Sequence, residues 1–334
     1  MRIVALGRTE ILYNSILELK KNGHEIVLII TCQESPGYKI TANDFKLLAN
    51  SLGVEFIKAE NINAPSVISQ IKKQSPDIGI SVNWRYIIDK KVRDCFPHGI
   101  INAHAGDLPR YRGNATPNWA IINGENKIVL TLHLMTTQLD AGQILLQKEM
   151  QISNKTYISD IYDFINKNCP KMFSKIINNY ESNSIAPKEQ SKKPKSILRC
   201  YPRNPKDGEI DWSKQSHELD RLIRAVSDPF AGAYTFLGIE KLIIWKAHQE
   251  IPPYNFLGTP GQVAEIKPKT GEVAVITGDG FLVLEEVETK SVGRTRASEI
   301  IKTPRTRLGL DISGEIIKLN EEFEDIKKLF QKRH

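Results

Sequence analysis

The first half of this chain alternates between short apolar runs and longer runs with helical spacing, and this alternation limits the folds open to it. The apolar runs are continuous and rich in Ile and Val, as in strands buried on both faces of a parallel sheet. Strands are expected over Ile3–Leu6, Glu25–Thr31, Val54–Ile57, Ile78–Val82 and Gly99–Asn102. Helices are expected over Ile11–Lys21, Thr41–Leu52, Ser66–Lys73 and Lys90–Cys95. The second of these helices should begin with Thr41 as its N-cap and be closed by Gly53. This order predicts an α/β domain with a mostly parallel sheet and helices on both faces.

Beyond residue 126 the pattern changes. Two β-branched runs, Lys127–Thr137 and Gln143–Ile152, are expected to pair as strands. A long helix is expected from Tyr157 to Tyr180, interrupted near Pro170. Residues 186–208 are rich in Pro, Lys and Ser and poor in apolar side chains, which is typical of a linker. We therefore expect the first domain to occupy residues 1–185.

The remaining residues have the pattern of a smaller domain over 209–305. A predicted helix is followed by five strand-like runs at hairpin spacing: His217–Val226, then Ala233–Leu237, Lys241–Lys246, Gly261–Ile266, Glu272–Ile276 and Phe281–Val287. Short strands so close together predict a small antiparallel β-barrel. Residues 306–334 are expected to form a charged, amphipathic helical tail.

Composition excludes several other classes of chain. With 334 residues, 40% apolar and 25% charged, and a mean hydropathy of −0.32, the chain is not collagen-like, disordered or a disulfide miniprotein. The longest apolar run, Ile26–Ile30, is far shorter than the roughly 20 residues of a membrane helix. The first residues lack the pattern of a signal peptide. We therefore expect a cytoplasmic protein without a membrane partner.

Cysteine spacing and net charge leave the partner open. Cys32, Cys95, Cys169 and Cys200 form no C-x-x-C pair, so free thiols are expected rather than disulfides or a zinc site. The formal net charge of +7 is compatible with RNA and equally with small anionic substrates such as nucleotides. The first strand is followed by Gly7 alone, without a G-x-G-x-x-G or a P-loop, which argues against a classical dinucleotide or ATP site.

The stretch that carries the most chemistry is INAHAGDLPRYRGNATPNWAIINGE at residues 101–125. It begins where a predicted strand ends, which is where ligands bind in open α/β sheets. Asn102 and His104 are two residues apart, so their side chains face the same side of an extended chain. Asp140 falls in the turn between the two later strands.

These three residue types are sufficient for acyl transfer to an amine without a covalent intermediate. An Asn amide donates to the oxyanion that forms as a carbonyl becomes tetrahedral. A His with a pKa of about 6.5 takes the proton of the amine, and an Asp orients the imidazole and raises its basicity. A loop histidine and an Asp-Ala-Gly turn also occur as purely structural features, so spacing alone leaves both interpretations open.

Three separate segments resemble those of one known family. The first comprises Asn102-Ala-His104, the following LPRYRG and Asp140-Ala-Gly; the second is SVNWRYII at 81–88; the third is DWSKQSHELDRLIRAVSDPFAGAYTFLG at 211–238. They resemble the signature, the pterin-contacting segment and the start of the C-terminal domain of the N10-formyltetrahydrofolate-dependent formyltransferases. The resemblance extends to about residue 290. It implies a Rossmann-like catalytic domain, an OB-like second domain, and N10-formyltetrahydrofolate as co-substrate, with no metal.

The resemblance also implies individual roles. Asn102 would stabilise the oxyanion, His104 would shuttle the proton and Asp140 would orient His104. The folate site would be lined by Tyr86, Ile87, Ile88, Asn114, Thr136, Thr137, Leu139 and Asp140, and substrate contacts would come from Arg8, Arg112, Gly113, Asp228 and Phe230. Asn114 departs from the amino-arabinose formyltransferases, which often have Arg there. Residues 86–88 also fit the end of a core strand.

Two acceptors compete. In methionyl-tRNA formyltransferases the loop after the second strand carries a basic insertion, whereas TCQESPGYKITANDF here contains only Lys39, beside two acidic residues. Binding to RNA phosphates needs several cations. The segments PNWAIINGE at 117–125 and RAVSDPFAGAY at 224–234 resemble the formyltransferase of UDP-4-amino-4-deoxy-L-arabinose. We therefore expect a nucleotide-linked amino sugar, a precursor of cell-surface polysaccharide such as lipopolysaccharide, with methionyl-tRNA as the alternative.

Two other functions fit the sequence less well. An OB-like domain could bind nucleic acid, but Trp245 follows two isoleucines and is expected in the core rather than on an exposed stacking surface. A formyl-folate hydrolase would use the same three residues on water, but those proteins resemble a form with an added regulatory domain. A homodimer is compatible with the resemblance. The sugar, its nucleotide and the position of its amine do not follow from the sequence.

Overall fold

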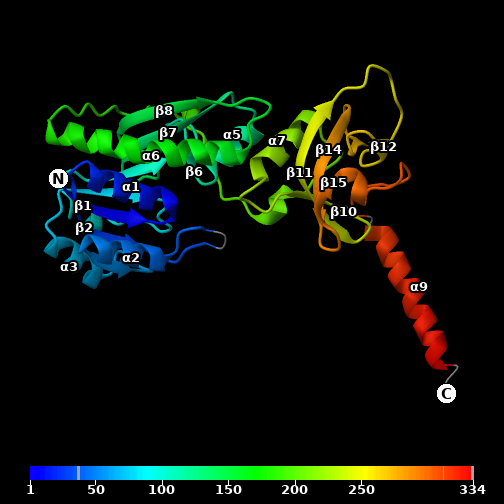
Figure 1. The fold of residues 1–334 in the computed structure, drawn as a ribbon, viewed down its shortest axis with the longest axis horizontal. Coiled ribbons are helices and arrows are strands. Elements are labelled where there is room, and N and C mark those ends of the chain that lie inside the picture. Colours follow the sequence, from blue (N-terminus) through cyan, green and yellow to red (C-terminus); the bar gives the residue numbers. More distant parts are fainter. Residues whose placement is uncertain (36–37, 311, 332–334) are drawn as a thin grey trace. The chain divides into compact units, whose positions relative to one another are not determined.

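The structure, a computed structural model, describes residues 1–35, 38–310 and 312–331 (Figure 1). The chain divides into two units, Met1–Arg203 and Asn204–His334, each built on its own main sheet. The first unit extends beyond the expected boundary at residue 185, because most of the segment predicted as a linker packs onto it.

The first unit contains a seven-stranded sheet with the order β3-β2-β1-β4-β5-β7-β8. The five parallel strands are β1 (Arg2–Gly7), β2 (Glu25–Thr31), β3 (Glu55–Lys58), β4 (Ile78–Val82) and β5 (Ile100–His104); β7 (Lys127–Leu134) and β8 (Ile144–Gln151) are antiparallel. The helices are α1 (Thr9–Lys21), α2 (Ala42–Leu52), α3 (Pro65–Lys73), α4 (Lys90–Arg93), α5 (Thr116–Ile122) and α6 (Ile158–Glu181). The order 3-2-1-4-5 is that of a Rossmann-like half sheet, so the predicted fold class is confirmed.

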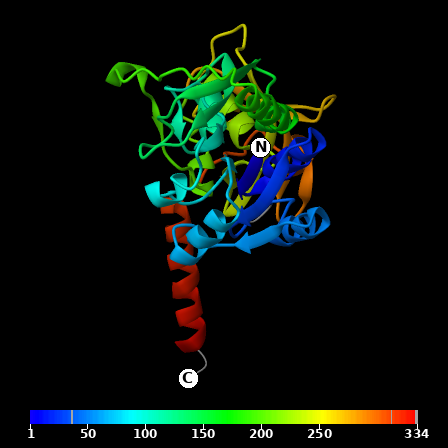
Figure 2. The same ribbon diagram turned by 90° about the vertical axis from the view of Figure 1, so that its left-hand side faces the viewer.

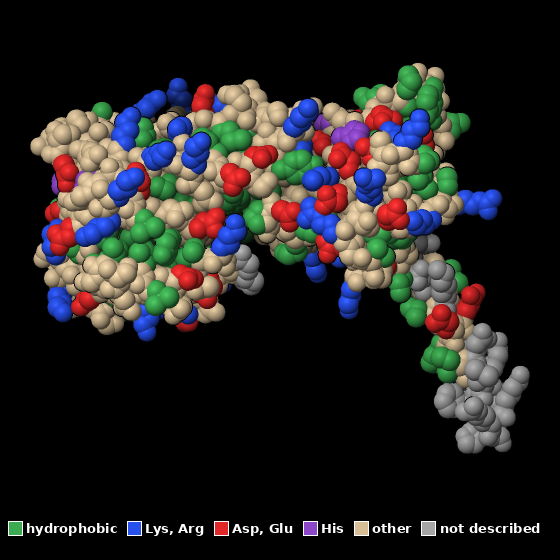
Figure 3. Space-filling view, in the orientation of Figure 1, with side chains coloured by type: hydrophobic (Ala, Val, Ile, Leu, Met, Phe, Trp, Pro, Cys, Tyr) green, Lys and Arg blue, Asp and Glu red, His purple; other side chains and the backbone are tan. Residues whose placement is uncertain are grey.

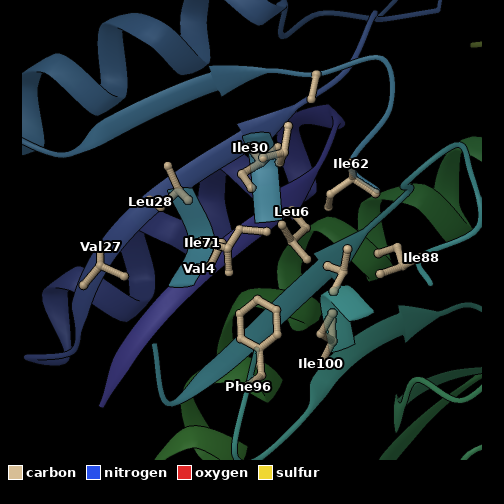
Figure 4. Close-up of a cluster of buried hydrophobic side chains, with 13 residues drawn as sticks. Val4, Leu6, Val27, Leu28, Ile30, Ile62, Ile71, Ile88, Phe96 and Ile100 are labelled. Atoms are coloured by element: carbon tan, nitrogen blue, oxygen red, sulfur yellow. The ribbon is translucent and has the colours of Figure 1, made fainter. Parts of the chain in front are cut away.

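Helices cover both faces of this sheet because residues of β1 alternate between them. Val4 and Leu6 are buried in one cluster with Ile30 of β2 and Ile71 of α3 (Figure 4). On the opposite face α1 contacts β1 and packs against α6. Burying such a side chain stabilises the fold by about 1.5–3 kcal/mol, so this core fixes the strand ends on which the site is built.

The boundaries of α2 confirm the predicted caps. The Thr41 hydroxyl accepts a hydrogen bond from the Asp44 N–H, and the Asp44 carboxylate accepts one from the Thr41 N–H at 2.7 Å. Gly53 follows the helix in the left-handed conformation, with φ 67°. Both ends of α2 therefore satisfy backbone groups that would otherwise have no partner.

Other local predictions differ from the structure. The helix α6 continues through Pro170, which is buried with Cys169 and Phe173, so packing offsets the hydrogen bond that proline cannot donate. The helix α5 does not follow from the sequence pattern. The strand β7 ends at Leu134 rather than Thr137, so the residues after it form a loop at the end of the sheet.

The predicted linker, 186–208, contains short structured pieces. The strand β9 (Arg199–Cys200) pairs in parallel with β6 (Arg112–Gly113), and short 3-10 helices occur at η1 (Pro194–Ser196) and η2 (Pro205–Gly208). Lys188 forms a bridge with Ile144 at the start of β8. Residues that look like a solvated connection therefore add to the edge of the first unit.

The second unit contains a six-stranded antiparallel sheet, in which β15 adds to the five strands expected from the sequence. Its elements are α7 (Ser216–Val226), β10 (Ala233–Leu237), β11 (Glu240–Glu250), β12 (Val263–Lys267), β13 (Glu272–Ile276), β14 (Phe281–Thr289), β15 (Gly293–Arg296), α8 (Ala297–Ile300) and α9 (Ile312–Gln331). Trp245 is buried and donates through Nε1 to Glu288, which confirms its expected place in the core.

A segment after α8 closes this sheet. The N–H of Val263, at the start of β12, donates to Thr306, and the Leu308 N–H donates to Gly261 at 2.7 Å. On the other side the Gly309 N–H donates to Phe236 in β10 at 2.9 Å. Residues 306–309 thus join the two edge strands, which is how a barrel removes exposed edges. The barrel extends past the expected boundary at residue 305.

Candidate active site

Two predicted catalytic side chains lie at the carboxyl end of β5. Asn102 and His104 are two residues apart and share one side of the strand. Pairing with β7 places His133 opposite Asn102 and Thr131 opposite His104. The adjacent strands therefore add a second histidine to the predicted pair.

Asp140 lies between these two histidines. Its carboxylate oxygens are 3.7 Å from His104 Nδ1 and 3.6 Å from His133 Nε2, and the Gly113 N–H donates to it at 2.8 Å. Burial alone would raise the pKa of Asp140, but attraction to the protonated forms of the two histidines and the hydrogen bond from the Gly113 N–H lower it to about 2. The carboxylate is therefore charged at neutral pH.

His104 is held in a defined tautomer. Its Nε2 is 2.6 Å from the Tyr111 carbonyl oxygen, which can only accept, so Nε2 carries the proton and the lone pair is on Nδ1, towards Asp140. Burial lowers the pKa of His104, while the charge of Asp140 opposes that shift. The imidazole is thus neutral at pH 7 and can accept a proton at Nδ1.

His133 orients the amide of Asn102. Its Nδ1 donates to the Leu134 carbonyl at 2.9 Å, which leaves Nε2 to accept from Asn102 Nδ2 at 3.3 Å. His133 does not stand out in the sequence because it lies inside an apolar strand. The signal that could have found it is the antiparallel pairing of the strand that follows the Asn102-Ala-His104 motif.

A tight loop after β5 holds His104 from the other side. A Cβ on Gly106 would lie 2.6 Å from His104 Nε2 and would also collide with the Tyr111 carbonyl, so only glycine fits there. Tyr111 has a positive φ of 57°, and its hydroxyl donates to Glu125 at 2.8 Å. The loop therefore fixes the carbonyl that determines the His104 tautomer.

Gln190, from the predicted linker, supports the loop of Asp140. Its side-chain amide is buried and donates to the carbonyls of Asp140 at 2.8 Å and Gly142 at 2.7 Å. Its carbonyl accepts from Arg112 Nη2 at 2.7 Å. Arg112 and Gly113 were both predicted to contact substrate. Arg112 instead binds Gln190, and the Gly113 N–H binds Asp140.

The residues expected to line the folate site form two neighbouring segments. Arg93 donates through one Nη to the Ile88 carbonyl and through the other to Thr137 Oγ1 at 3.2 Å. Asn63 donates to the Ile87 carbonyl at 2.9 Å and accepts from the Asp89 N–H at 2.9 Å. These contacts hold residues 86–88 beside the loop after β7.

Within these two segments the side chains have different surroundings. Tyr86, Ile87 and Leu139 are 47, 79 and 52% exposed, which is unusual for apolar side chains at the end of a sheet. Ile88 is instead buried in the core, which fits the strand-end interpretation for that residue. Thr136 Oγ1 donates to the Gln138 carbonyl and shapes the loop.

The remaining predicted residues have other partners. The Arg8 guanidinium donates to the carbonyls of Asn83 and Gln33 at 3.1 Å each, so it joins two loops. Asn114 is exposed, and its N–H donates to Cys200. Asp228 and Phe230 belong to the second unit, where Asp228 forms an ion pair with Arg294 at 2.7 Å.

The β6–β9 pairing adds a basic and aromatic cluster next to the loop of His104. The Arg199 guanidinium lies 5.4 Å from the Tyr201 ring centre, and that of Arg203 lies 4.7 Å from the Trp119 ring. Trp119 Nε1 donates to the Tyr201 carbonyl at 2.9 Å. The charge of Arg199 contributes to the lowered pKa of His104, so this cluster lies within electrostatic reach of the site.

The described residues offer neither a metal-binding cluster nor a membrane-spanning helix. No group of three or more His, Cys, Asp or Glu side chains could hold a metal ion within that part of the chain. No helix in 1–35, 38–310 or 312–331 is long and apolar enough to span a membrane. The expected lack of a metal and the expected cytoplasmic location stay predictions.

Two family models match this chain. The model described as formyl transferase matches residues 1–177, and that described as formyl transferase, C-terminal domain, matches residues 203–305. The chain belongs to the formyl transferase family. It is an N10-formyltetrahydrofolate-dependent enzyme of this family, which confirms the resemblance seen in the sequence.

Individual relatives of this formyltransferase differ in their names and in the ligands bound in their structures. A methionyl-tRNA formyltransferase of Citrifermentans bemidjiense is 28% identical over 306 residues, 90% of this chain and 93% of that protein. An N-formyltransferase structure from Helicobacter canadensis with folinic acid and dTDP-3-aminofucose has a TM-score of 0.62 and 20% identity, over 84% of this chain and 97% of that one. HypX from Aquifex aeolicus in complex with tetrahydrofolic acid has a TM-score of 0.59 and 18% identity, over 90% of this chain and 47% of that one. This chain thus spans about half the length of HypX, and these two structures share its fold.

Proposed function

We propose that this formyltransferase uses the amine of a nucleotide-linked amino sugar as acceptor, with Asn102, His104 and Asp140 as its catalytic residues. The observation that carries the reaction is the position of Asp140 between His104 and His133, beside Asn102. A hydrogen-bond donor and a neutral base lie together at the end of the sheet. These are the groups that acyl transfer to an amine requires.

Each residue has a defined part in this proposal. One N–H of the Asn102 amide donates to His133, and the other is left to donate to the formyl oxygen as negative charge develops there. His104 takes the amine proton at Nδ1. The imidazolium that results donates to Asp140 through Nδ1 and to the Tyr111 carbonyl through Nε2. That proton then passes to the nitrogen that loses the formyl group.

The exposed apolar side chains beside the site fit a folate. Tyr86, Ile87 and Leu139 present apolar surface at the sheet end, and Arg93 and Asn63 hold their segments in place. When bound, N10-formyltetrahydrofolate supplies the formyl group. Surfaces of this kind bury flat aromatic rings such as a pterin.

The basic and aromatic cluster favours a nucleotide as part of the acceptor. Arg199 and Arg203 provide guanidinium groups, which bind phosphate in a bidentate manner. Trp119 and Tyr201 provide aromatic faces for a base. A cluster of two arginines, of which Arg199 acts electrostatically on His104, matches a diphosphate-linked sugar better than an RNA stem, which needs a longer row of cations.

Methionyl-tRNA is the second candidate, because a curated relative that is 28% identical is a methionyl-tRNA formyltransferase. The loop after β2 argues against it. Its described part contains a single lysine, Lys39, and Arg8, which lies after β1, is occupied by the carbonyls of Asn83 and Gln33.

The test is formyl transfer from N10-formyltetrahydrofolate to UDP-, dTDP- and GDP-linked amino sugars, with initiator methionyl-tRNA in parallel. We expect a mass gain of one formyl group on a sugar nucleotide and none on tRNA. Turnover on tRNA alone would overturn the proposed acceptor and leave the reaction intact.

Arg199→Ala then tests the phosphate contact. We expect the KM for the sugar nucleotide to rise about tenfold, because a charge-assisted hydrogen bond is lost, while the KM for the folate stays unchanged. Lys195→Ala, an exposed lysine of the same segment, is the matched control and should leave both constants unchanged. Equal effects of the two variants would contradict the assignment of Arg199.

A further inference from the structure

The helix α9 presents a row of exposed apolar side chains. It is one continuous helix in both ribbon views (Figures 1 and 2), and Figure 3 shows green side chains along its described part. Ile316, Leu319, Phe323 and Ile326 are 53, 63, 57 and 50% exposed. Their separations of three, four and three residues are those of the a and d positions of a coiled coil. The sequence extends the same spacing with Ile312 before them and Phe330 after them.

A helix with such a face is incomplete on its own. Most of the stability of helices in proteins comes from packing an apolar face rather than from helix propensity. Four large apolar side chains in one row are each at least half exposed. Their burial against a partner would stabilise both the helix and the contact.

We propose that α9 pairs with α9 of a second copy of this chain as a parallel, two-stranded coiled coil. With Ile316 and Phe323 at a positions, Glu322 falls at g and Lys327 at e. In a parallel pair, residue g of one helix meets residue e of the next heptad on the other. Glu322 of each copy thus meets Lys327 of its partner, and symmetry makes this contact twice.

The same charges disfavour other occupants. In an antiparallel pair centred on these four residues, the two Glu322 side chains would face each other, which is repulsive. Acidic residues outnumber lysines five to three over residues 312–331, and Lys332 and Arg333 only bring the balance to zero, so the segment has no net positive charge to attract anionic lipids. A second copy is the partner whose charges fit.

The first test is the mass of the full-length enzyme, measured by sedimentation velocity over a range of concentrations. We expect a monomer–dimer equilibrium that Leu319→Asp weakens at least about tenfold, because it buries a carboxylate in the seam. Ile317→Asp is the matched control: it is the same change on the same helix, at a site 58% exposed but outside the seam, and it should leave the equilibrium unchanged. Formyl transfer should be unchanged in both variants.

Charge reversal tests the parallel register. Glu322→Lys or Lys327→Glu alone should weaken the dimer about threefold, and the double variant should restore it. A wild-type monomer at all concentrations would overturn the proposal, as would a dimer that Leu319→Asp leaves intact. If vesicles of anionic lipid bind the wild type but not Leu319→Asp, the apolar row is a membrane contact and the proposal also fails.

Discussion

At the scale of single residues, two neighbouring groups have pKa shifts that divide their roles. Asp140 stays charged because attraction to the protonated forms of the two histidines and the Gly113 N–H outweigh its burial and hold its pKa at about 2. His104 stays neutral because burial lowers its pKa from the ordinary value. An ion and a neutral base 3.7 Å apart are what proton transfer from an amine requires.

These shifts predict the acid limb of the pH profile. Activity should fall as the pH drops and His104 becomes protonated, with a midpoint below its ordinary pKa of about 6.5. Asp140→Asn removes the negative charge that raises the pKa of His104, so the midpoint should move to still lower pH while the rate at neutral pH falls. Measurement of kcat/KM from pH 4.5 to 8 checks this. A limb centred above pH 6.5, or one that Asp140→Asn leaves in place, would contradict it.

Replacing Asn102 or His133 should lower the activity of the enzyme by different amounts. Asn102→Ala should lower kcat by about 10²–10³, the effect of losing an oxyanion donor. His133→Ala should lower kcat about tenfold through the freed Asn102 amide, with the KM for the folate unchanged. His133→Gln keeps an acceptor and should recover part of the loss. A KM effect without a kcat effect would show that His133 contributes to substrate binding rather than to the position of the Asn102 amide.

The sequence could place Asn102 and His104 on one side of a strand through their alternation, and it added Asp140 through the family resemblance. It could not identify His133 or Gln190. His133 is distinguished from a core residue only by the pairing of β5 with β7. Gln190 lies in a segment with the composition of a linker. Residues that act through long-range contacts leave little local signal.

At the scale of elements, the short helix α4 connects the two segments of the proposed folate site through Arg93. Arg93→Ala should raise the KM for N10-formyltetrahydrofolate about tenfold, because residues 86–88 lose their tie to the loop after β7. Lys91→Ala, exposed on the same helix, is the control. Steady-state kinetics with the folate concentration varied would measure both variants. Equal KM values for the two would show that the Arg93 contacts do not support folate binding.

Elements with strong local patterns were predictable, and those fixed by packing were not. The five parallel strands and the caps of α2 follow from apolar runs and from Thr41 and Gly53. The continuity of α6 through Pro170 depends on burial in the folded unit. The two-residue strands β6 and β9 exist only through each other, so neither has a periodicity to detect.

At the scale of the whole molecule, the barrel of the second unit depends on the segment that closes it. A chain ended after Lys302 loses residues 306–309 and the burial of Leu308, together worth about 3 kcal/mol. The unfolding midpoint of this unit should fall by at least about 10 °C relative to a chain ended after Leu310. Calorimetry of both chains, which lack α9 alike, makes the comparison. Equal midpoints would show that closure contributes little.

The family models match residues 1–177 and 203–305, and the stretch between them carries Gln190 and Arg199. Gln190 supports the loop of Asp140, and Arg199 lies beside the loop of His104. Recombination between members of this family would therefore have different consequences on either side of this stretch. A crossover near residue 180 would pair one parent's Asn102, His104 and Asp140 with the other's supporting segment. A crossover at Arg203 would exchange the barrel and leave the candidate site of one parent intact.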